Sequence, residues 1–124
     1  MKILIADDDI VLSHLFSFFL KQEGHGIETA NDCPSAMEAV SDLHPDVVLL
    51  DVNMPNGSGL EVLRDIMKAK TSRRPSIIVI SADPGMERPA KDFGAHSFLC
   101  KPVDIQHLLG VVGKMQMQQD RLSA

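Results

Sequence analysis

Short apolar runs alternate along the chain with longer stretches in which apolar residues recur every three or four positions. The short runs are typical of β-strands, and the longer stretches have the period of amphipathic helices. The five predicted strands span Lys2–Ala6, Gly26–Thr29, Asp46–Leu50, Ser76–Ile80 and Ser97–Cys100. Strands that alternate with helices require crossover connections, which produce a parallel sheet. We therefore predict a doubly wound α/β fold, with a five-stranded parallel sheet and helices on both faces.

Four predicted helices are well marked by their apolar period, and one is not. The marked ones are the stretch from Leu12 to Leu20, the segment after Asp32-Cys33-Pro34, residues 60–69 and the segment from about Asp104 onward. On the first, the predicted buried face contains Leu12, Leu15, Phe16, Phe19 and Leu20. Between Ser81 and Phe93 the chain contains Pro84, Gly85 and Pro89, which interrupt helices. We expect the fourth helix to be short or broken.

The composition suits one globular domain. The chain has 124 residues, of which 44% are hydrophobic and 23% charged. We assign residues 1–115 to this domain and residues 116–124 to a polar helix end or a linker to an output domain. No apolar run approaches the roughly 20 residues that span a bilayer, and no signal peptide is present, so we expect no membrane contact.

The net charge limits the partners that we expect, and the cysteines indicate the compartment. The net charge of −5 argues against direct nucleic acid binding by this domain, because such binding needs a basic face. The two cysteines, Cys33 and Cys100, lie far apart and have no metal-ligand spacing. Two free thiols in a reducing cytoplasm are the expected state.

Polar residues that suit one kind of chemistry follow four of the predicted strands. Asp7, Asp8 and Asp9 follow the first strand, Asp51 the third, Ser81 the fourth and Lys101 the fifth. Ligands of open parallel sheets bind beyond the carboxyl ends of the strands. Each group also has a plainer interpretation: the first aspartates as helix caps, Asp51 and Ser81 as turn or cap residues, and Lys101 as a solvated lysine.

Taken together, the strand-end groups match phosphoryl chemistry. Clustered carboxylates repel one another unless a cation lies between them, and hard oxygen ligands suit Mg²⁺. A carboxylate can accept a phosphoryl group, while a lysine and a hydroxyl stabilise its oxygens. A phosphate-binding loop of the G-x-x-x-x-G-K-[ST] type is missing, which argues against ATP as the direct donor.

The chain resembles the receiver domains of two-component response regulators, the chemotaxis-regulator-like family. The resemblance covers residues 2 to 115, and it is carried by Ile3–Asp8, Asp46–Asp51, Met54-Pro55 with Gly59, Ile80–Ala82, Gly94-Ala95 and Phe98–Pro102. It implies the strand order 2-1-3-4-5. It also implies Mg²⁺-dependent transfer of a phosphoryl group from a phosphohistidine to the domain, which catalyses only its own phosphorylation and dephosphorylation.

The resemblance also implies roles for the acidic residues. Asp51 would be the phosphoacceptor. Asp8 would bind Mg²⁺ directly and Asp7 largely through water. The backbone carbonyl of Asn53 would be a further ligand.

The remaining roles implied by the resemblance fall on the fourth and fifth strand ends. Ser81 would hydrogen-bond the phosphoryl group, and Lys101 would pair with it. Phe98 stands where the family places an aromatic switch residue, although a plain core aromatic explains it equally well. The bond between Lys101 and Pro102 would be cis.

Two neighbours of these residues are expected to have structural roles. Asp9 matches a variable position of the family, so we predict that it caps the first helix. Cys100 should point away from Lys101 along its strand, and we predict that it is buried in the packing.

The partners implied by the resemblance are a sensor histidine kinase or a histidine phosphotransfer protein. Apolar residues beyond the buried face of the first helix, notably Ile10, Val11 and Phe18, favour a docking surface there over an extension of the core. The interval from Ser81 to Lys101, which contains the fourth helix, is short for the family. The sequence does not identify an output partner or output domain, and it does not show whether the protein forms a homodimer.

Two other classes of function compete with a phosphorylated switch. A haloacid-dehalogenase-type phosphohydrolase also uses an aspartate nucleophile with Mg²⁺, but it needs a second aspartate where this chain has Asn53. An interaction module that has lost phosphorylation keeps the fold without the chemistry. The complete set of strand-end groups argues against that alternative.

Overall fold

The computed structural model describes residues 1–71 and 73–123. Five parallel strands form one sheet in the order β2-β1-β3-β4-β5. Their bounds are β1 Lys2–Ala6, β2 Gly26–Ala30, β3 Val47–Asp51, β4 Ser76–Ser81 and β5 Ser97–Cys100. The predicted fold class and strand order are confirmed. Three strands end one residue later than predicted, so that Ala30, Asp51 and Ser81 are the last residues of β2, β3 and β4.

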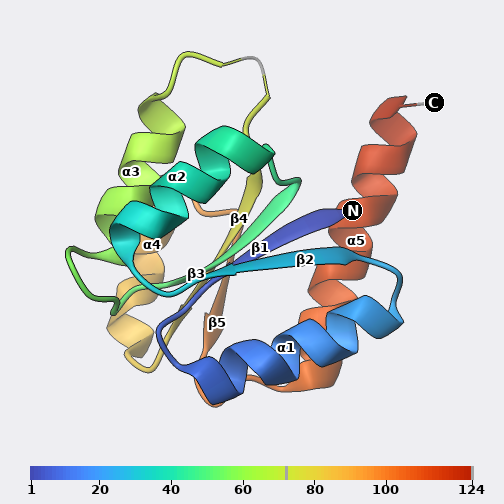
Figure 1. Ribbon diagram of the computed structural model, residues 1–124, viewed down its shortest axis with the longest axis horizontal. Coiled ribbons are helices and arrows are strands. Elements are labelled where there is room, and N and C mark those ends of the chain that lie inside the picture. The colour runs from blue at the N-terminus through green and yellow to red at the C-terminus, as the bar shows by residue number, and fades with distance from the viewer. Residues whose placement is uncertain (72, 124) are drawn as a thin grey trace.

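Helices cover both faces of the sheet (Figure 1). The helices α1 (Ile10–Gln22) and α5 (Ile105–Ser123) pack on one face. The helices α2 (Cys33–Leu43), α3 (Gly59–Lys68) and α4 (Glu87–Asp92) pack on the other. This two-sided cover explains why the central strands are apolar along their whole length.

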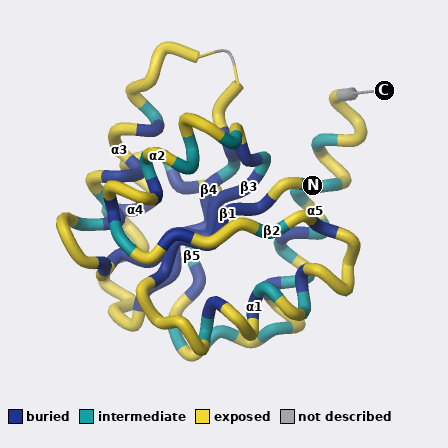
Figure 2. The backbone as a smooth tube through the Cα atoms, viewed as in Figure 1, coloured by how far each residue is buried: buried dark blue, intermediate teal, exposed yellow. Residues whose placement is uncertain are grey.

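Alternate residues of each central strand enter two separate cores. In β1, Ile3 and Ile5 face α1 and α5, whereas Leu4 and Ala6 face α2 and α3. β3 and β4 alternate in the same way, and Figure 2 shows these strands as the buried centre of the molecule. The sheet is thus a rigid platform that fixes where its strand ends lie.

The fourth helical segment is short, as predicted. A 3₁₀ turn, η1 (Pro84–Met86), leads into α4, which has six residues. Pro84 begins η1 and Pro89 lies within α4, and neither has an amide hydrogen to donate.

Side-chain caps fix where the longer helices begin. The acceptor and donor pairs are Asp9 with the Leu12 amide, Asp32 with the Ser35 amide, Ser58 with the Leu60 amide and Asp104 with the Gln106 amide. After α1 the chain turns at Gly24, whose φ of 92° favours glycine. The helices therefore start next to the carboxyl ends of the strands that precede them.

Two sequence-based expectations about burial are wrong. Leu15 was expected in the core but is 43% exposed, because the buried face of α1 is narrower and contains Ser13, Phe16 and Leu20. Cys100 was expected to be buried but is exposed. It alternates with the buried Leu99, so it points to the opposite face of the sheet.

The last helix is longer than the sheet it packs on. α5 runs to Ser123, so residues 116–123 are helical, and Figure 1 shows its last turns projecting beyond the sheet. Ala124 lies outside the described residues, and the predicted boundary at residue 115 stays a prediction. Within the part of the chain that the structure describes, we find no helix long and apolar enough to cross a membrane.

Candidate functional site

The strand ends bring the predicted site residues to one edge of the sheet. Asp7 and Asp8 directly follow β1, and Asp51 ends the neighbouring strand β3. Ser81 ends β4 and pairs in register with Cys100 of β5, which places Lys101 one residue beyond. Because the strands are parallel and adjacent, these side chains meet although they come from four parts of the sequence.

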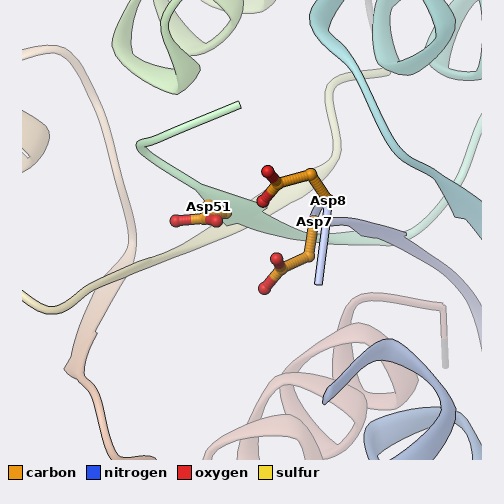
Figure 3. A group of neighbouring side chains, drawn as sticks. All are labelled: Asp7, Asp8 and Asp51. Atoms are coloured by element: carbon orange, nitrogen blue, oxygen red, sulfur yellow. The ribbon is translucent and has the colours of Figure 1, made fainter. Parts of the chain in front are cut away.

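Three carboxylates form the centre of the site, which we call the acidic trio: Asp7, Asp8 and Asp51. One carboxylate oxygen of each lies within 4.8 Å of the others. Figure 3 shows Asp7 and Asp8 extending from the end of β1 beside Asp51. Asp7 and Asp51 are buried, whereas Asp8 is exposed to solvent. Hard oxygen donors at this spacing, with one side open to water, are the ligand set that Mg²⁺ prefers.

Lys101 lies against the acidic trio. Its Nζ is 3.3 Å from Asp51 Oδ2 and 3.5 Å from Asp7 Oδ2. Partial burial lowers the pKa of Lys101, but the Asp51 and Asp7 carboxylates raise it more, and the net shift is upward. The ammonium group therefore stays charged and neutralises part of the acidic trio.

The Asp51 carboxyl is held in a strained electrostatic state. Burial is the largest cause that raises its pKa, and the nearby Asp7 carboxylate adds to it. Lys101 and the Asn53 amide, which donates to Asp51 Oδ1 at 3.2 Å, act in the opposite direction. The net result is a pKa of about 6. A divalent cation beside Asp51 would relieve this strain.

Ser81 supplies a buried hydroxyl at the end of β4. Its Oγ accepts a hydrogen bond from the Asp83 amide at 3.0 Å. A hydroxyl that accepts one hydrogen bond still has its own hydrogen to donate. Ser81 can therefore donate to an oxygen atom bound at the strand ends.

Two other predictions concern β5 and the residue that follows Lys101. The peptide bond between Lys101 and Pro102 is cis, as predicted. Phe98 is partly buried and packs against the core on the α2–α3 face. Its predicted role as a switch depends on motion and stays a prediction, as does the role of the Asn53 carbonyl as a metal ligand.

The cap of α1 is Asp9 rather than its acidic neighbours. Asp9 Oδ1 accepts the Leu12 amide at 3.0 Å, and Asp7 Oδ1 accepts the Asp9 amide at 2.9 Å. The carboxylate of Asp8 accepts no hydrogen bond from the residues that the structure describes. The helix-cap interpretation therefore fits Asp9 and leaves Asp8 available to a ligand.

Removing the Asp9 cap should affect stability and nothing else. We expect Asp9→Ala to lower the free energy of unfolding by about 0.5–2 kcal/mol. The loss should be the same with and without Mg²⁺, since Asp9 is outside the acidic trio. Urea unfolding in EDTA and in Mg²⁺ measures it, and a loss confined to the Mg²⁺ series would assign Asp9 to the metal site instead.

Two residues support the site although the sequence analysis assigned them no role there. A Cβ atom at Gly59 would collide with the backbone carbonyl of Asp51, so glycine is needed where α3 begins against the end of β3. The Cys33 amide donates to the Pro55 carbonyl at 3.2 Å and ties α2 to the loop after Asp51. The signal for Gly59 was its place in the family resemblance; Cys33 had none.

Comparisons with known proteins show the family and the fold. Residues 3–113 match the family model of the response regulator receiver domain. The chain belongs to this family. The match covers most of the chain.

Individual relatives support the same assignment. The chain is 36% identical to the response regulator MprA of Mycobacterium leprae over 88% of its length, and 29% identical to the sensory/regulatory protein RpfC of Xanthomonas campestris over 99%. It spans 48% and 18% of those two proteins. The chain therefore corresponds to one part of each.

Solved structures show the same fold. The chemotaxis response regulator CheY4 of Vibrio cholerae superimposes with a TM-score of 0.84 at 28% identity, covering 92% of this chain and 97% of that one. The receiver domain of the Francisella response regulator 1452 gives a TM-score of 0.87 at 23% identity, covering 95% and 98%.

Proposed function

We propose that this receiver domain accepts a phosphoryl group on Asp51, in a Mg²⁺-dependent reaction, from a phosphohistidine of a sensor kinase or histidine phosphotransfer protein. One observation carries the proposal: a buried carboxylate lies within 4.8 Å of two others and 3.3 Å from a lysine. This arrangement provides a nucleophile, a cation site and a counter-charge for phosphoryl oxygens at one point.

The proposed transfer moves one phosphoryl group between two protein side chains. A carboxylate oxygen of Asp51 attacks the phosphorus, the phosphorus–nitrogen bond of the phosphohistidine breaks, and the imidazole leaves with the electron pair. Lys101 then pairs with a phosphoryl oxygen instead of the free carboxylate, and Ser81 donates a hydrogen bond to another.

The residues that would hold Mg²⁺ are Asp7, Asp8, Asp51 and the backbone carbonyl of Asn53. Bound there, the ion would neutralise charge on the transferred oxygens. The protein would act on no separate substrate and would catalyse only its own phosphorylation and dephosphorylation. The product is an acyl phosphate, which water can hydrolyse.

The proposed output is a change of surface near β4, β5 and α4. Ser81 drawn toward a phosphoryl group would vacate space for the Phe98 ring. Because η1 and α4 together are short, we expect the output partner to contact a different surface from that of a receiver with a full fourth helix. A homodimer and an output domain elsewhere in a longer protein are parts of the same proposal.

The proposed site of contact with the phosphodonor is α1. Three of its apolar side chains are more than half exposed: Ile10 at 63%, Val11 at 79% and Phe18 at 57%. Two free cysteines, Cys33 and Cys100, fit the cytoplasmic setting that we propose for the reaction.

The test of the proposal is labelling by a small phosphodonor. Incubation of the protein with acetyl phosphate and Mg²⁺ should give an adduct that is stable in acid and labile in base, and peptide mapping should locate it on Asp51. Absence of the adduct favours an interaction module that does not use phosphorylation. Rapid release of phosphate from added phosphomonoesters favours a phosphohydrolase.

Lys101 is proposed to act on the phosphoryl group rather than on the metal. We expect Lys101→Ala at pH 8 to leave Mg²⁺ affinity unchanged or raised by up to about tenfold, because a positive charge beside the acidic trio is removed. Labelling by acetyl phosphate should fall. Mg²⁺ titration measures the first effect, with Lys114→Ala on the exposed side of α5 as control. A large loss of Mg²⁺ affinity would instead assign Lys101 to holding the site together.

A further inference from the structure

A pocket lies at the end of the sheet opposite the acidic trio. Its volume is about 360 Å³, within the range of roughly 300–1,000 Å³ that is typical of small-molecule sites. Its lining comes from the first residue of β4, the start of β5 and the middle of α5. The acidic trio lies beyond the other ends of these parallel strands, roughly 17 Å away along the strand direction. We call it the β5–α5 pocket.

The polar side chains of the β5–α5 pocket can all donate hydrogen bonds. They are Ser76, His96, Ser97, Lys114 and Gln118. Lys114 adds a full positive charge. Among the residues that the structure describes, no carboxylate lines this pocket, although the chain as a whole has a net charge of −5. The lining therefore suits an anion.

The protein uses almost none of these donors itself. The Ile77 amide donates to His96 Nδ1 at 3.0 Å, so the neutral ring has its hydrogen on Nε2 and can donate it. Beyond this bond, the five polar side chains form no hydrogen bond or ion pair with the described part of the chain. All five are partly or fully exposed, so a ligand can reach them.

One carboxylate in a neighbouring pocket is already compensated. Asp46 lines a pocket that shares Ser76 and Met115 with the β5–α5 pocket. The Asp46 carboxylate accepts hydrogen bonds from the Lys2 amide at 2.8 Å and from the Gln119 side chain at 2.9 Å. Arg73 lies 3.5 Å from it as an ion-pair partner. Its charge therefore does little to repel an anion beside Lys114.

Two apolar side chains complete the lining and indicate what the anion is attached to. Val111 and Met115 of α5 are partly buried and pack against the core between the sheet, α1 and α5. An apolar or aromatic group of a ligand would remove their remaining surface from water, which a bare oxyanion would not do. A phosphate group offers three acceptor oxygens to donors on β4, β5 and α5, whereas a carboxylate offers two.

We propose that the β5–α5 pocket binds a phosphomonoester whose organic part is apolar or aromatic. Lys114 pairs with the phosphate, and Ser76 and Ser97 donate hydrogen bonds to its oxygens. Val111 and Met115 contact the organic part. The binding is non-covalent and does not depend on phosphorylation of Asp51, because the two sites lie at opposite ends of the sheet.

The test uses phenyl phosphate as the probe, followed by ¹H–¹⁵N NMR at pH 7.5 without Mg²⁺, where the acidic trio repels anions. Saturable shifts are expected at the amides of Ser76, Ser97 and Lys114. Lys114→Gln should weaken binding about tenfold, the equivalent of one charge-assisted hydrogen bond. Ser97→Ala should weaken it roughly three- to tenfold. Lys21→Gln, the same change at an exposed lysine of α1, should leave it unchanged.

A series of probes tests the chemical class. Phenyl phosphate should bind about fivefold more tightly than methyl phosphate if roughly 40 Å² of the ring is buried. Met115→Gln, which keeps the length of the side chain and makes it polar, should reduce this advantage. Benzoate has the same ring with one charge and two oxygens, and it should bind at least about tenfold more weakly than phenyl phosphate.

Four outcomes overturn the proposal. Benzoate that binds as tightly as phenyl phosphate would mean that phosphate is not recognised. Methyl phosphate that binds as tightly as phenyl phosphate would mean that no organic part is recognised. Unchanged binding by Lys114→Gln, or equal weakening by Lys21→Gln, would mean that the probe collects at exposed cations. A lack of saturable shifts would mean that the pocket holds only water.

Discussion

Replacing Asp51 with asparagine is expected to abolish labelling by acetyl phosphate and to stabilise the metal-free protein above pH 6. The loss of labelling should be complete, because an amide is not a nucleophile toward phosphorus and the side chain keeps its shape. The gain in stability follows from the raised pKa of Asp51, about 6 in the folded protein against an ordinary value of 3.8. We expect a gain of about 1–3 kcal/mol at pH 7.5.

The gain in stability should depend on pH, which distinguishes it from a general effect of the substitution. Between pH 4 and pH 6 the folded protein keeps the Asp51 proton while the unfolded chain has released it. The stability contribution of this group is therefore present below pH 4 and is lost as the pH rises through 6. The asparagine variant has no proton to lose there, so the two proteins should differ little at pH 4 and most above pH 6.

Urea unfolding in EDTA across this pH range measures the difference. Asp120→Asn is the matched control, because it makes the same chemical change at an exposed carboxylate on α5. A variant that is less stable than wild type at every pH would show that the Asp51 carboxylate is satisfied without metal. Labelling that persists in the variant would mean that another acid is the acceptor.

The sequence predicted the site because its residues stand at strand ends. The strands β1, β3 and β4 are buried on both faces, so their apolar runs are continuous and their ends easy to locate. The first polar residue after each run must then lie at the edge of the sheet. Asp7, Asp51, Ser81 and Lys101 were found in this way, before any distance between them was available.

The sequence could not show which of three consecutive aspartates does what. The choice depends on the backbone at the start of α1, where the Asp9 side chain folds back to the Leu12 amide and the Asp7 side chain to the Asp9 amide. Asp8 is left with its carboxylate beside Asp51. Spacing along a chain carries no information on this, since all three residues have the same chemistry and adjacent positions.

The apolar pattern also could not predict which residues of α1 are buried. Periodicity gives the direction of the buried face but not its width, which depends on how closely α5 and the sheet approach. Leu15 lies outside the buried face and is exposed, whereas the polar Ser13 lies within it and is buried. A pattern of apolar residues cannot indicate a buried serine, so the burial of Ser13 could not be predicted from the sequence.

The role of Asp8 could not be predicted from the sequence. Replacing Asp8 should give the second large effect on stability. If Asp8 is a metal ligand crowded by Asp7 and Asp51, the metal-free protein carries repulsion that no cation relieves. We expect Asp8→Ala to raise the stability of the metal-free protein at neutral pH, by less than Asp51→Asn does because Asp8 is exposed.

The response to Mg²⁺ should change more than the metal-free stability. At Mg²⁺ a hundredfold above its Kd, the wild type should gain about 2.7 kcal/mol. The Asp8→Ala variant should lose most of this gain, because one direct ligand and one charge are missing. Asp9→Ala is the matched control: it removes the neighbouring carboxylate, should be less stable in both conditions, and should respond to Mg²⁺ as the wild type does.

Four urea midpoints, for wild type and Asp8→Ala in EDTA and in Mg²⁺, separate the two roles of Asp8. A helix cap acts in the metal-free protein, so its removal lowers both midpoints equally. A metal ligand acts through the ion, so its removal brings the EDTA and Mg²⁺ midpoints together. If Asp8→Ala is weaker than wild type in EDTA and gains equally from Mg²⁺, Asp8 is not a ligand and the acidic trio loses its exposed member. If Asp8→Ala has a higher midpoint than wild type in EDTA and this midpoint changes little with Mg²⁺, the ion acts by relieving repulsion among the three carboxylates.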